Sequence, residues 1–467
     1  MTARQPRPRH PRRQSVWHEG ALGENASHFT PPGKTPRSSL ITAPARAFLA
    51  DYSRTADANL TLSRRLIHNE AVEMRSSEKF LSILSASYGG GHQRVGEAIA
   101  EEWKARVGGR VDIVDYFTRF TNPTFFALTK FSYYQTVRFA PNLQAKFYKM
   151  MGEIAPDSRF RRAVNRTGMD RLERYLTSER PDVVCCVHWT FTGTMSDLKI
   201  EGRTRVPCLT AITDYVSHGE WIHPRIDRYA VPHAVMRDGL LARGVPPERI
   251  IVTGMPIEGK FRHALDRNAL AADLGLAADV PVILVMAGAY AALGRVGDIV
   301  QVLARSPRPV QALVVCANAR RLADQVRAAA ARSPHRFLVY DYVNNVDELM
   351  SVSDLLIGKA GGVTVSEALA KRLPMLLYGS IPGQEESNTQ FLVEQGAAEA
   401  AASPAELRER LEGLLAHPER LAAMRHAAAR LGQPGAAGVV VAHLAQLADA
   451  SGDAAGDRRR AASPRAP

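Results

Sequence analysis

The chain has 467 residues with a formal net charge of +13, and 45% of its residues are apolar while 23% are charged. This composition is typical of a folded globular protein with room for about two or three domains, and it excludes a fibrous or wholly disordered chain. The longest apolar stretch, residues 280–293, is interrupted by glycine and is too short to span a bilayer.

The first part of the chain, residues 1–75, is rich in arginine, proline and serine, and we predict a disordered basic arm there. It carries 12 Lys and Arg against 6 Asp and Glu. Met74 stands close to the first predicted strand, so the sequence leaves open whether the functional chain starts at Met1 or at Met74.

From residue 79 onward, apolar runs of strand length alternate with helical patterns. A first series of predicted strands occupies residues 79–86, 110–116, 181–188, 206–213, 228–232 and 249–254, with helices such as 92–106 and 165–178 between them. After a bend at 253–261, a second series occupies 280–288, 310–317, 336–343, 354–361 and 375–380, with helices at 294–304, 319–331, 345–352, 363–371 and 386–395.

Strands that alternate with helices in this way indicate parallel sheets covered by helices on both faces. Two such series predict an α/β protein with two doubly wound, Rossmann-like domains that face a cleft. We place the first domain at 76–255 and the second at 256–432, followed by a C-terminal helix at 433–450 and a disordered basic tail at 451–467.

The first predicted strand leads into a glycine-rich corner, "SASYGGGHQRVGEAIAEEW" (85–103). A bare backbone at a helix start presents unpaired N–H groups to an anion or a developing oxyanion, so Gly89, Gly90 and Gly91 suit such a ligand. The corner does not match the GxGxxG fingerprint of dinucleotide-binding sites, because Arg94 stands where that fingerprint has its last glycine. The alternative is a tight turn that binds no ligand, in which His92 is only a neighbour of the helix cap.

A second corner lies at "IGKAGGVTVSEALAKRLPMLLYGSIPGQEESNTQFLVEQGAA" (357–398). Gly361 and Gly362 follow a predicted strand and precede a helix that carries Glu367. That glutamate is either an exposed first-turn acid or an acceptor for two sugar hydroxyls. Both corners follow strands, and ligands of open α/β sheets bind at the carboxyl ends of strands.

Together with "YDYVNNVDELMSVSDLLIGKAGGVTVSEAL" and "PGQEESN", these motifs resemble glycosyltransferase family 28 over residues 78–440. The similarity is greatest to monogalactosyldiacylglycerol synthases and processive diacylglycerol glucosyltransferases, and the lipid II-forming GlcNAc transferase is more distant. The resemblance implies a GT-B fold with a UDP-sugar bound in the second domain. It implies that Glu367 binds ribose, that Gly361, Gly362 and Thr364 hold the diphosphate, that Gln384, Glu385 and Asn388 contact the hexose, and that Tyr342 and Val343 contact uracil.

Transfer with inversion, as in that family, needs a base for the acceptor hydroxyl and stabilisation of the diphosphate leaving group. His92 is one candidate base because its pKa needs no tuning, and Asp214, in "AITDYVSHGEW", is the rival if burial raises its pKa. Trp221 matches a tryptophan of the related enzymes. The chain has no DxD motif, and the spacing of His218, His223 and His233 matches no usual metal site, so we expect neither a metal nor another cofactor.

Residues 116–162 interrupt the alternation with a basic, aromatic insert. Basic residues and apolar side chains together favour binding to an anionic membrane, and the resemblance implies the same. A helical core with a solvated basic face is the alternative. The side chains that carry this prediction are Phe125, Phe126, Phe131, Tyr133, Tyr134 and Phe147, with Lys130, Arg138, Lys146 and Lys149.

We therefore expect an inverting transferase that moves glucose or galactose from a UDP-sugar to diacylglycerol and forms a β-glycosyldiacylglycerol. The alternative within the class is transfer of GlcNAc to another lipid acceptor. The sequence contains neither a nucleic-acid-binding motif nor a complete dinucleotide fingerprint. It therefore supports neither a nucleic-acid-binding protein nor a nicotinamide-dependent oxidoreductase. Four cysteines without CxxC spacing indicate a cytoplasmic protein, here on the inner face of the cell membrane.

Overall fold

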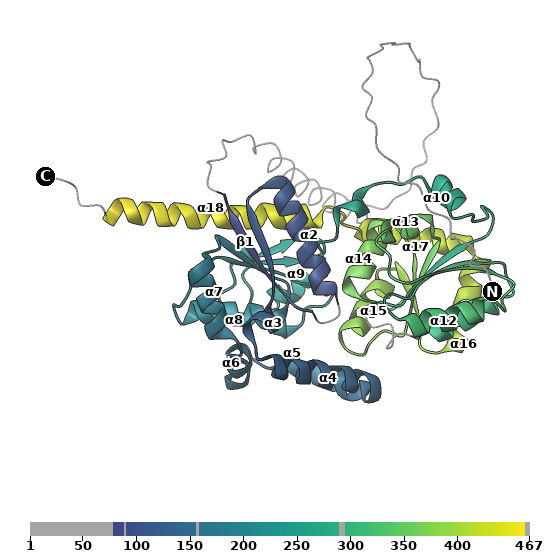
Figure 1. Ribbon diagram of the computed structural model, residues 1–467, viewed down its shortest axis with the longest axis horizontal. Coiled ribbons are helices and arrows are strands. Elements are labelled where there is room, and N and C mark those ends of the chain that lie inside the picture. Colours follow the sequence, from purple (N-terminus) through teal and green to yellow (C-terminus); the bar gives the residue numbers. More distant parts are fainter. Residues whose placement is uncertain (1–77, 88–89, 156–157, 289–294, 463–467) are drawn as a thin grey trace, which may run out of the picture. The chain divides into compact units, whose positions relative to one another are not determined.

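The computed structural model describes residues 78–87, 90–155, 158–288 and 295–462 (Figure 1). The predicted arm at 1–75 and the end of the predicted tail at 463–467 lie outside the described residues. For residues 452–462 the backbone alone is described.

The first sheet has six parallel strands in the order β2-β1-β3-β4-β5-β6. Strand β1 pairs with β2 on one side and with β3 on the other, so the strand order reverses between β1 and β3. A reversal of this kind opens a crevice at the carboxyl ends of the two strands. The strands are β1 (Phe80–Ser85), β2 (Arg110–Asp115), β3 (Val183–Cys186), β4 (Cys208–Ala211), β5 (Arg228–Val231) and β6 (Ile250–Val252).

The second sheet also has six parallel strands, in the order β12-β11-β10-β7-β8-β9. Its order reverses between β7 and β10. Strand β12 was not among the predicted strands, because its sequence "AEAA" has no β-branched or aromatic residue. The strands are β7 (Val282–Met286), β8 (Gln311–Val315), β9 (Arg336–Tyr340), β10 (Leu355–Gly358), β11 (Met375–Tyr378) and β12 (Ala398–Ala401).

We call residues 78–252 the first lobe and residues 282–431 the second lobe. The first lobe has helices α2 (Gly91–Arg106), α7 (Met169–Glu179), α8 (Trp189–Ile200) and α9 (Ala234–Leu241) beside its strands, with 3-10 turns η1 (Gly219–Trp221) and η2 (Pro247–Arg249). The second lobe has α11 (Val296–Ala304), α12 (Arg320–Ala330), α13 (Val346–Val352), α14 (Gly362–Ala370), α15 (Gln384–Glu394), α16 (Pro404–Ala416) and α17 (Pro418–Leu431). Between the lobes lie η3 (Gly259–Arg262) and α10 (Arg267–Asp273).

The insert after β2 forms four helices, α3 (Tyr116–Phe120), α4 (Pro123–Phe139), α5 (Pro141–Glu153) and α6 (Arg159–Asn165). Asn122 caps α4 by accepting a hydrogen bond from the Thr124 backbone, and proline stands at the first position of α4 and of α5, where it favours helix initiation. The predicted helix 165–178 is wrong in its start, because α6 ends at Asn165 and α7 begins only at Met169.

The C-terminal helix α18 (Ala436–Ala462) packs on α2 and on β3 and β4 of the first lobe, as Figure 1 shows in yellow. The prediction of a helix at 433–450 with a loose tail from 451 is corrected by this finding, since α18 starts at Ala436 and continues to Ala462. Residues 451–462 contain several alanines and arginines, which have high helix propensity, and this explains the continuation.

Candidate active site

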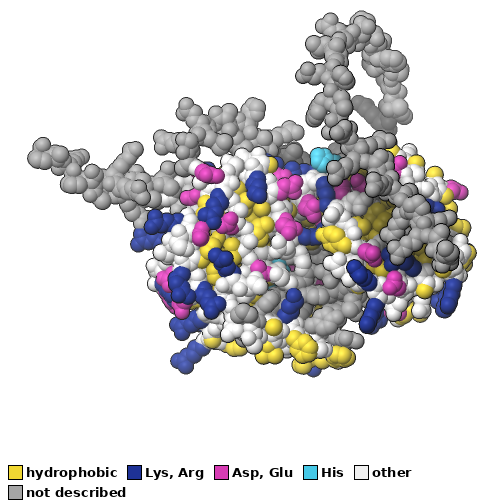
Figure 2. Space-filling model, in the orientation of Figure 1, with side chains coloured by type: hydrophobic (Ala, Val, Ile, Leu, Met, Phe, Trp, Pro, Cys, Tyr) yellow, Lys and Arg dark blue, Asp and Glu magenta, His cyan; other side chains and the backbone are white. Residues whose placement is uncertain are grey.

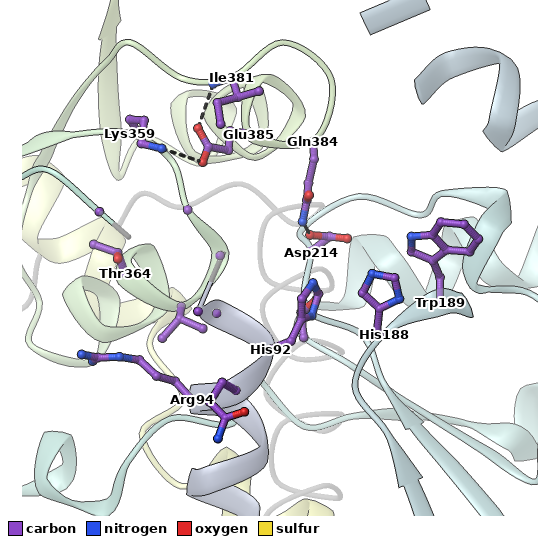
Figure 3. A pocket seen from close by; sticks show the side chains of 18 of the residues that line it. His92, Arg94, His188, Trp189, Asp214, Lys359, Thr364, Ile381, Gln384 and Glu385 are labelled. Carbon is purple, nitrogen blue, oxygen red and sulfur yellow. Dashed lines mark hydrogen bonds and ion pairs between the residues drawn. The ribbon is translucent and has the colours of Figure 1, made fainter. Parts of the chain in front are cut away.

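One cavity of about 870 Å³ is lined by loops that follow strands of both sheets (Figure 3). From the first lobe come the loops after β1, β3 and β4, and from the second lobe those after β7, β8, β9, β10 and β11. Both points of strand-order reversal therefore open into the same cavity, as expected for the ligand site of open α/β sheets.

The glycine corner after β1 is on the wall of this cavity. Gly90 has a φ of 76°, a left-handed conformation that glycine adopts without strain, and Gly91 is the first residue of α2. Both line the cavity, whereas Gly89 lies outside the described residues. The structure thus places two of the three predicted glycines at the site.

His92 also lines the cavity, with its Nδ1 atom 2.7 Å from the Val187 carbonyl oxygen. Because a carbonyl oxygen only accepts hydrogen bonds, Nδ1 carries the proton and Nε2 keeps a lone pair. Burial lowers the pKa of His92 to about 4, although the hydrogen bond to Val187 acts in the opposite direction. The imidazole is therefore neutral at pH 7.

Asp214 lies after β4 and is 4% exposed. Its Oδ2 atom accepts a hydrogen bond of 3.2 Å from the Trp221 indole, and its Oδ1 atom accepts one from the Gln384 amide of the second lobe. Burial raises the pKa of Asp214 to about 6, against these two hydrogen bonds. Figure 3 shows the Gln384 side chain pointing at Asp214, with His92 nearby.

The second glycine corner stands at the amino-terminal end of α14. Gly361, Gly362 and Thr364 all line the cavity. A side chain at Gly362 would overlap the Thr213 carbonyl oxygen of the first lobe, so the close approach of the two lobes needs glycine at this position. A Cβ atom at Gly361 would have no described atom within 4 Å, so its space belongs to the cavity.

Glu367, one turn further along α14, lines the same cavity and is 2% exposed. The Arg94 guanidinium of α2 lies 3.4 Å from its carboxylate. Burial raises the pKa of Glu367 to about 7, and Arg94 only partly opposes this shift. The prediction of an exposed first-turn acid is therefore wrong, because Glu367 is buried and lies beyond the first turn of α14.

Lys359, between β10 and Gly361, brings a positive charge to the cavity. Its ammonium lies 3.4 Å from the Glu385 carboxylate, which also accepts a hydrogen bond from the Ile381 backbone. Gln384 and Glu385, which were predicted to contact the hexose, both line the cavity.

Asn388 is placed differently from the other predicted donor residues. It is fully buried, accepts a hydrogen bond of 2.9 Å from the Tyr215 backbone and donates one of 3.1 Å to the Ala360 carbonyl. It is not among the described residues that line the cavity. Asn388 thus joins the two lobes behind the site, while Tyr342 and Val343 do line the cavity.

Sequence reasoning missed several side chains that the fold brings into the cavity, namely Arg94, Lys359, His188 and Tyr148. Arg94 and Lys359 each stand within three residues of a glycine corner. A positive charge so close to a glycine-rich loop could have indicated that both side chains belong to the site. His188 follows β3, and its ring centroid is 4.8 Å from that of His92. The position of His188 at the carboxyl end of a strand could have indicated that it lies in the cavity.

The three histidines that were considered as metal ligands have structural partners. His218 donates to the Tyr148 carbonyl, His223 donates to the Glu220 carbonyl, and His233 caps α9. No group of three or more potential metal ligands occurs among the residues that the structure describes. In the same part of the chain, no helix is both long and apolar enough to cross a bilayer.

Comparison with known proteins fits this geometry. Residues 92–257 match the family model of monogalactosyldiacylglycerol (MGDG) synthase, and residues 282–439 match that of the glycosyltransferase family 28 C-terminal domain. The chain is 30% identical over 352 residues to a processive diacylglycerol beta-glucosyltransferase of Bacillus cereus (strain AH187), which covers 75% of this chain and 89% of the relative. The chain belongs to glycosyltransferase family 28.

Solved structures agree with this family 28 membership at the level of the fold. The chain superposes on Acinetobacter baumannii MurG with a TM-score of 0.52 at 17% identity, covering 79% of this chain and 99% of that one. It superposes on a UDP complex of S. aureus MnaA with a TM-score of 0.53 at 15% identity, covering 78% and 95%. The predicted GT-B fold is confirmed, and the protein is a glycosyltransferase.

Proposed function

We propose that the protein transfers glucose or galactose from a UDP-sugar to diacylglycerol, with inversion, at the inner face of the membrane. The name of the Bacillus cereus relative and the family model of residues 92–257 support the acceptor. The observation that carries the proposal is the shared cavity, into which both the glycine corner of α14 and the buried Asp214 open.

The second lobe binds the donor in this proposal. The amino-terminal end of α14 presents backbone N–H groups and the positive end of the helix dipole, which attract the diphosphate. Gly361, Gly362 and Thr364 are at this end, and Glu367 accepts hydrogen bonds from the ribose hydroxyls. Val343 packs on uracil, and Gln384 and Glu385 contact the hexose.

The leaving diphosphate gains negative charge as the glycosidic bond breaks, and this charge needs a preorganised positive partner. Lys359 lies two residues before Gly361, lines the cavity, and has its ammonium 3.4 Å from the Glu385 carboxylate. We assign it to the diphosphate, so that transfer proceeds without a bound metal.

Asp214 is the base in this proposal. A general base works best when its pKa is near the working pH, and the pKa of about 6 for Asp214 meets this condition better than that of about 4 for His92. When the donor hexose engages Gln384, the Oδ1 atom of Asp214 becomes available to the acceptor hydroxyl. That hydroxyl attacks the anomeric carbon from the face opposite the diphosphate and gives its proton to Asp214. His92, whose Nε2 keeps a lone pair, is the alternative acceptor of that proton.

The insert supplies the membrane contact. Along α5, Leu143, Phe147 and Met150 are exposed at i, i+4 and i+7, which places them on one face of the helix. Leu128 and Phe131 of α4 are exposed as well, and Figure 2 shows hydrophobic side chains gathered along the lower edge where Figure 1 labels α4 and α5. We call these five side chains the apolar face.

The apolar face lies next to positive charge. Lys146 and Lys149 are both exposed on α5. Apolar side chains that enter the headgroup region and lysines that attract anionic lipid favour a bilayer over a protein partner as the occupant. The side chains of Phe125, Phe126, Tyr133, Tyr134 and Arg138, which entered the same prediction, lie outside the described residues.

The test is incubation of the full chain with diacylglycerol in anionic vesicles and with radiolabelled UDP-glucose, UDP-galactose or UDP-GlcNAc, followed by thin-layer chromatography. We expect labelled monoglycosyldiacylglycerol from one of the two hexoses, in the β configuration, formed at least about 10²-fold more slowly by Asp214→Asn. A labelled product from UDP-GlcNAc alone, or no lipid product from any donor, would overturn the proposal.

A further inference from the structure

Tyr148 on α5 has a buried phenol group without a hydrogen-bond partner among the residues that the structure describes. The side chain lines the cavity of the candidate active site. A buried polar atom that stays unpaired costs free energy, and such an atom in a ligand cavity points to a partner that the ligand supplies.

The ring of Tyr148 is held in place by both lobes. It stacks on His218 with ring centroids 4.0 Å apart and an interplanar angle of 18°, and His218 Nε2 donates to the Tyr148 carbonyl oxygen over 2.9 Å. On the other side it packs on the second lobe, where a Cβ atom at Gly383 would lie only 3.1 Å from the ring. The phenol is therefore a fixed group of the cavity wall.

The two acidic groups near the phenol, Asp214 and Glu220, do not pair with it. Asp214 accepts from Trp221 and Gln384, and neither the Asp214 nor the Glu220 carboxylate forms a hydrogen bond with the phenol. Burial raises the pKa of Tyr148, and Asp214 and Glu220 raise it further, so the phenol stays protonated at neutral pH. The Tyr148 hydroxyl is thus a hydrogen-bond donor that has no acceptor among the described residues.

The position of Tyr148 indicates which oxygen this is. The preceding residue, Phe147, belongs to the exposed apolar face and also lines the cavity, so the cavity is continuous with that face. A glycerolipid that enters there keeps its acyl chains beside Phe147 and presents its free hydroxyl to Asp214. Its ester carbonyls then lie between these two points, beside Tyr148.

We propose that Tyr148 is an acceptor-binding residue, whose hydroxyl donates a hydrogen bond to an ester carbonyl oxygen of the glycerolipid that is glycosylated. This inference rests on the proposed function, because it takes diacylglycerol as the acceptor. It adds a specificity: a lipid with ester-linked chains binds better than one with ether-linked chains.

The experiment compares two acceptors, diacylglycerol and dialkylglycerol of equal chain length, with the full-length wild type and Tyr148→Phe. One neutral hydrogen bond corresponds to about a 3- to 10-fold preference, so the wild type should have a KM for the ester lipid lower by that factor. In Tyr148→Phe the preference should fall to about 1, through a higher KM for the ester lipid alone. The KM for the UDP-sugar should not change.

A matched control is Tyr175→Phe, which removes a phenol that pairs with Ser82 in the core of the first lobe, away from the cavity. It should keep the wild-type preference for the ester lipid. Equal loss on both lipids, an unchanged preference, or a raised KM for the UDP-sugar in Tyr148→Phe would each overturn the assignment. If the wild type glycosylates neither lipid, the proposed function itself fails, which is a distinct result.

Discussion

The Arg94 guanidinium of the first lobe lies 3.4 Å from the buried carboxylate of Glu367 in the second lobe. This ion pair connects the two glycine corners, because Arg94 follows Gly91 by three residues and Glu367 follows Gly362 by five. Despite Arg94, burial raises the pKa of Glu367 to about 7. The carboxyl that we assign to the ribose is thus only partly ionised at neutral pH.

Donor affinity should therefore rise with pH. The ionised carboxylate accepts two ribose hydroxyls better than the protonated acid does. With a pKa of about 7, the ionised fraction grows roughly tenfold from pH 6 to pH 8, and the association constant should follow. Titration calorimetry with a UDP-sugar measures this, since its diphosphate lacks the terminal phosphate of UDP, which ionises near pH 6.

Two variants test this origin of the pH dependence. Arg94→Gln removes the positive charge that lowers the pKa of Glu367, so the affinity rise should move to higher pH. Glu367→Gln should bind the UDP-sugar weakly and equally at pH 6 and pH 8. A wild-type affinity that is constant over this range would contradict the assignment of Glu367 to the ribose.

The pH–rate profile should identify the base. With saturating donor, kcat/KM for diacylglycerol should fall below about pH 6 if Asp214 takes the proton, and only below about pH 4 if His92 does. We expect the first result, because a protonated Asp214 cannot act as a base. Asp214→Asn should lose about 10²- to 10⁴-fold in rate, whereas His92→Asn should lose less and keep the fall near pH 6. A fall near pH 6 that persists in Asp214→Asn would contradict this prediction.

Gly361 and Gly362 are adjacent, yet alanine should act differently at each. At Gly362 a methyl group overlaps the Thr213 carbonyl, so we expect Gly362→Ala to lower the free energy of unfolding by about 1–3 kcal/mol. At Gly361 the methyl group meets open space in the cavity, so Gly361→Ala should keep the wild-type melting temperature and weaken donor binding. Thermal melts and calorimetry of the two variants check this, and equal effects at both positions would refute it.

The two sheets and both glycine corners were predictable from the sequence, since buried parallel strands are apolar runs and their carboxyl ends carry the ligand loops. The pairs that set the electrostatics of the site were not predictable. Arg94 and Glu367 are 273 residues apart, and Gln384 and Asp214 are 170 apart. Burial, which raises the pKa of Asp214, depends on such long-range packing. Asn388 shows the converse, because its motif position predicted a ligand contact and the fold uses it to join the lobes.

Transfer should continue without a divalent metal. The diphosphate charge is met by Lys359 and by the amino-terminal end of α14 in our proposal, so excess EDTA should change kcat by less than about twofold. Lys359→Met should lower kcat by about 10²- to 10³-fold, the usual cost of one lost donor to a developing anion. Complete loss of transfer in EDTA with recovery on added Mg²⁺ would show that the lysine does not suffice.

Charge reversal on α5 should weaken membrane binding. Lys146 and Lys149 are exposed beside the apolar face, and each lysine near an anionic surface contributes about 1 kcal/mol. Lys146→Glu with Lys149→Glu should therefore weaken binding to anionic vesicles by about 30-fold or more at low salt, measured by cosedimentation. Lys104→Glu with Arg332→Glu changes the net charge equally at exposed positions outside the insert and should leave binding nearly unchanged. Equal losses in the two variants would mean that net charge, rather than α5, attracts the protein to the bilayer, because only a local contact distinguishes them.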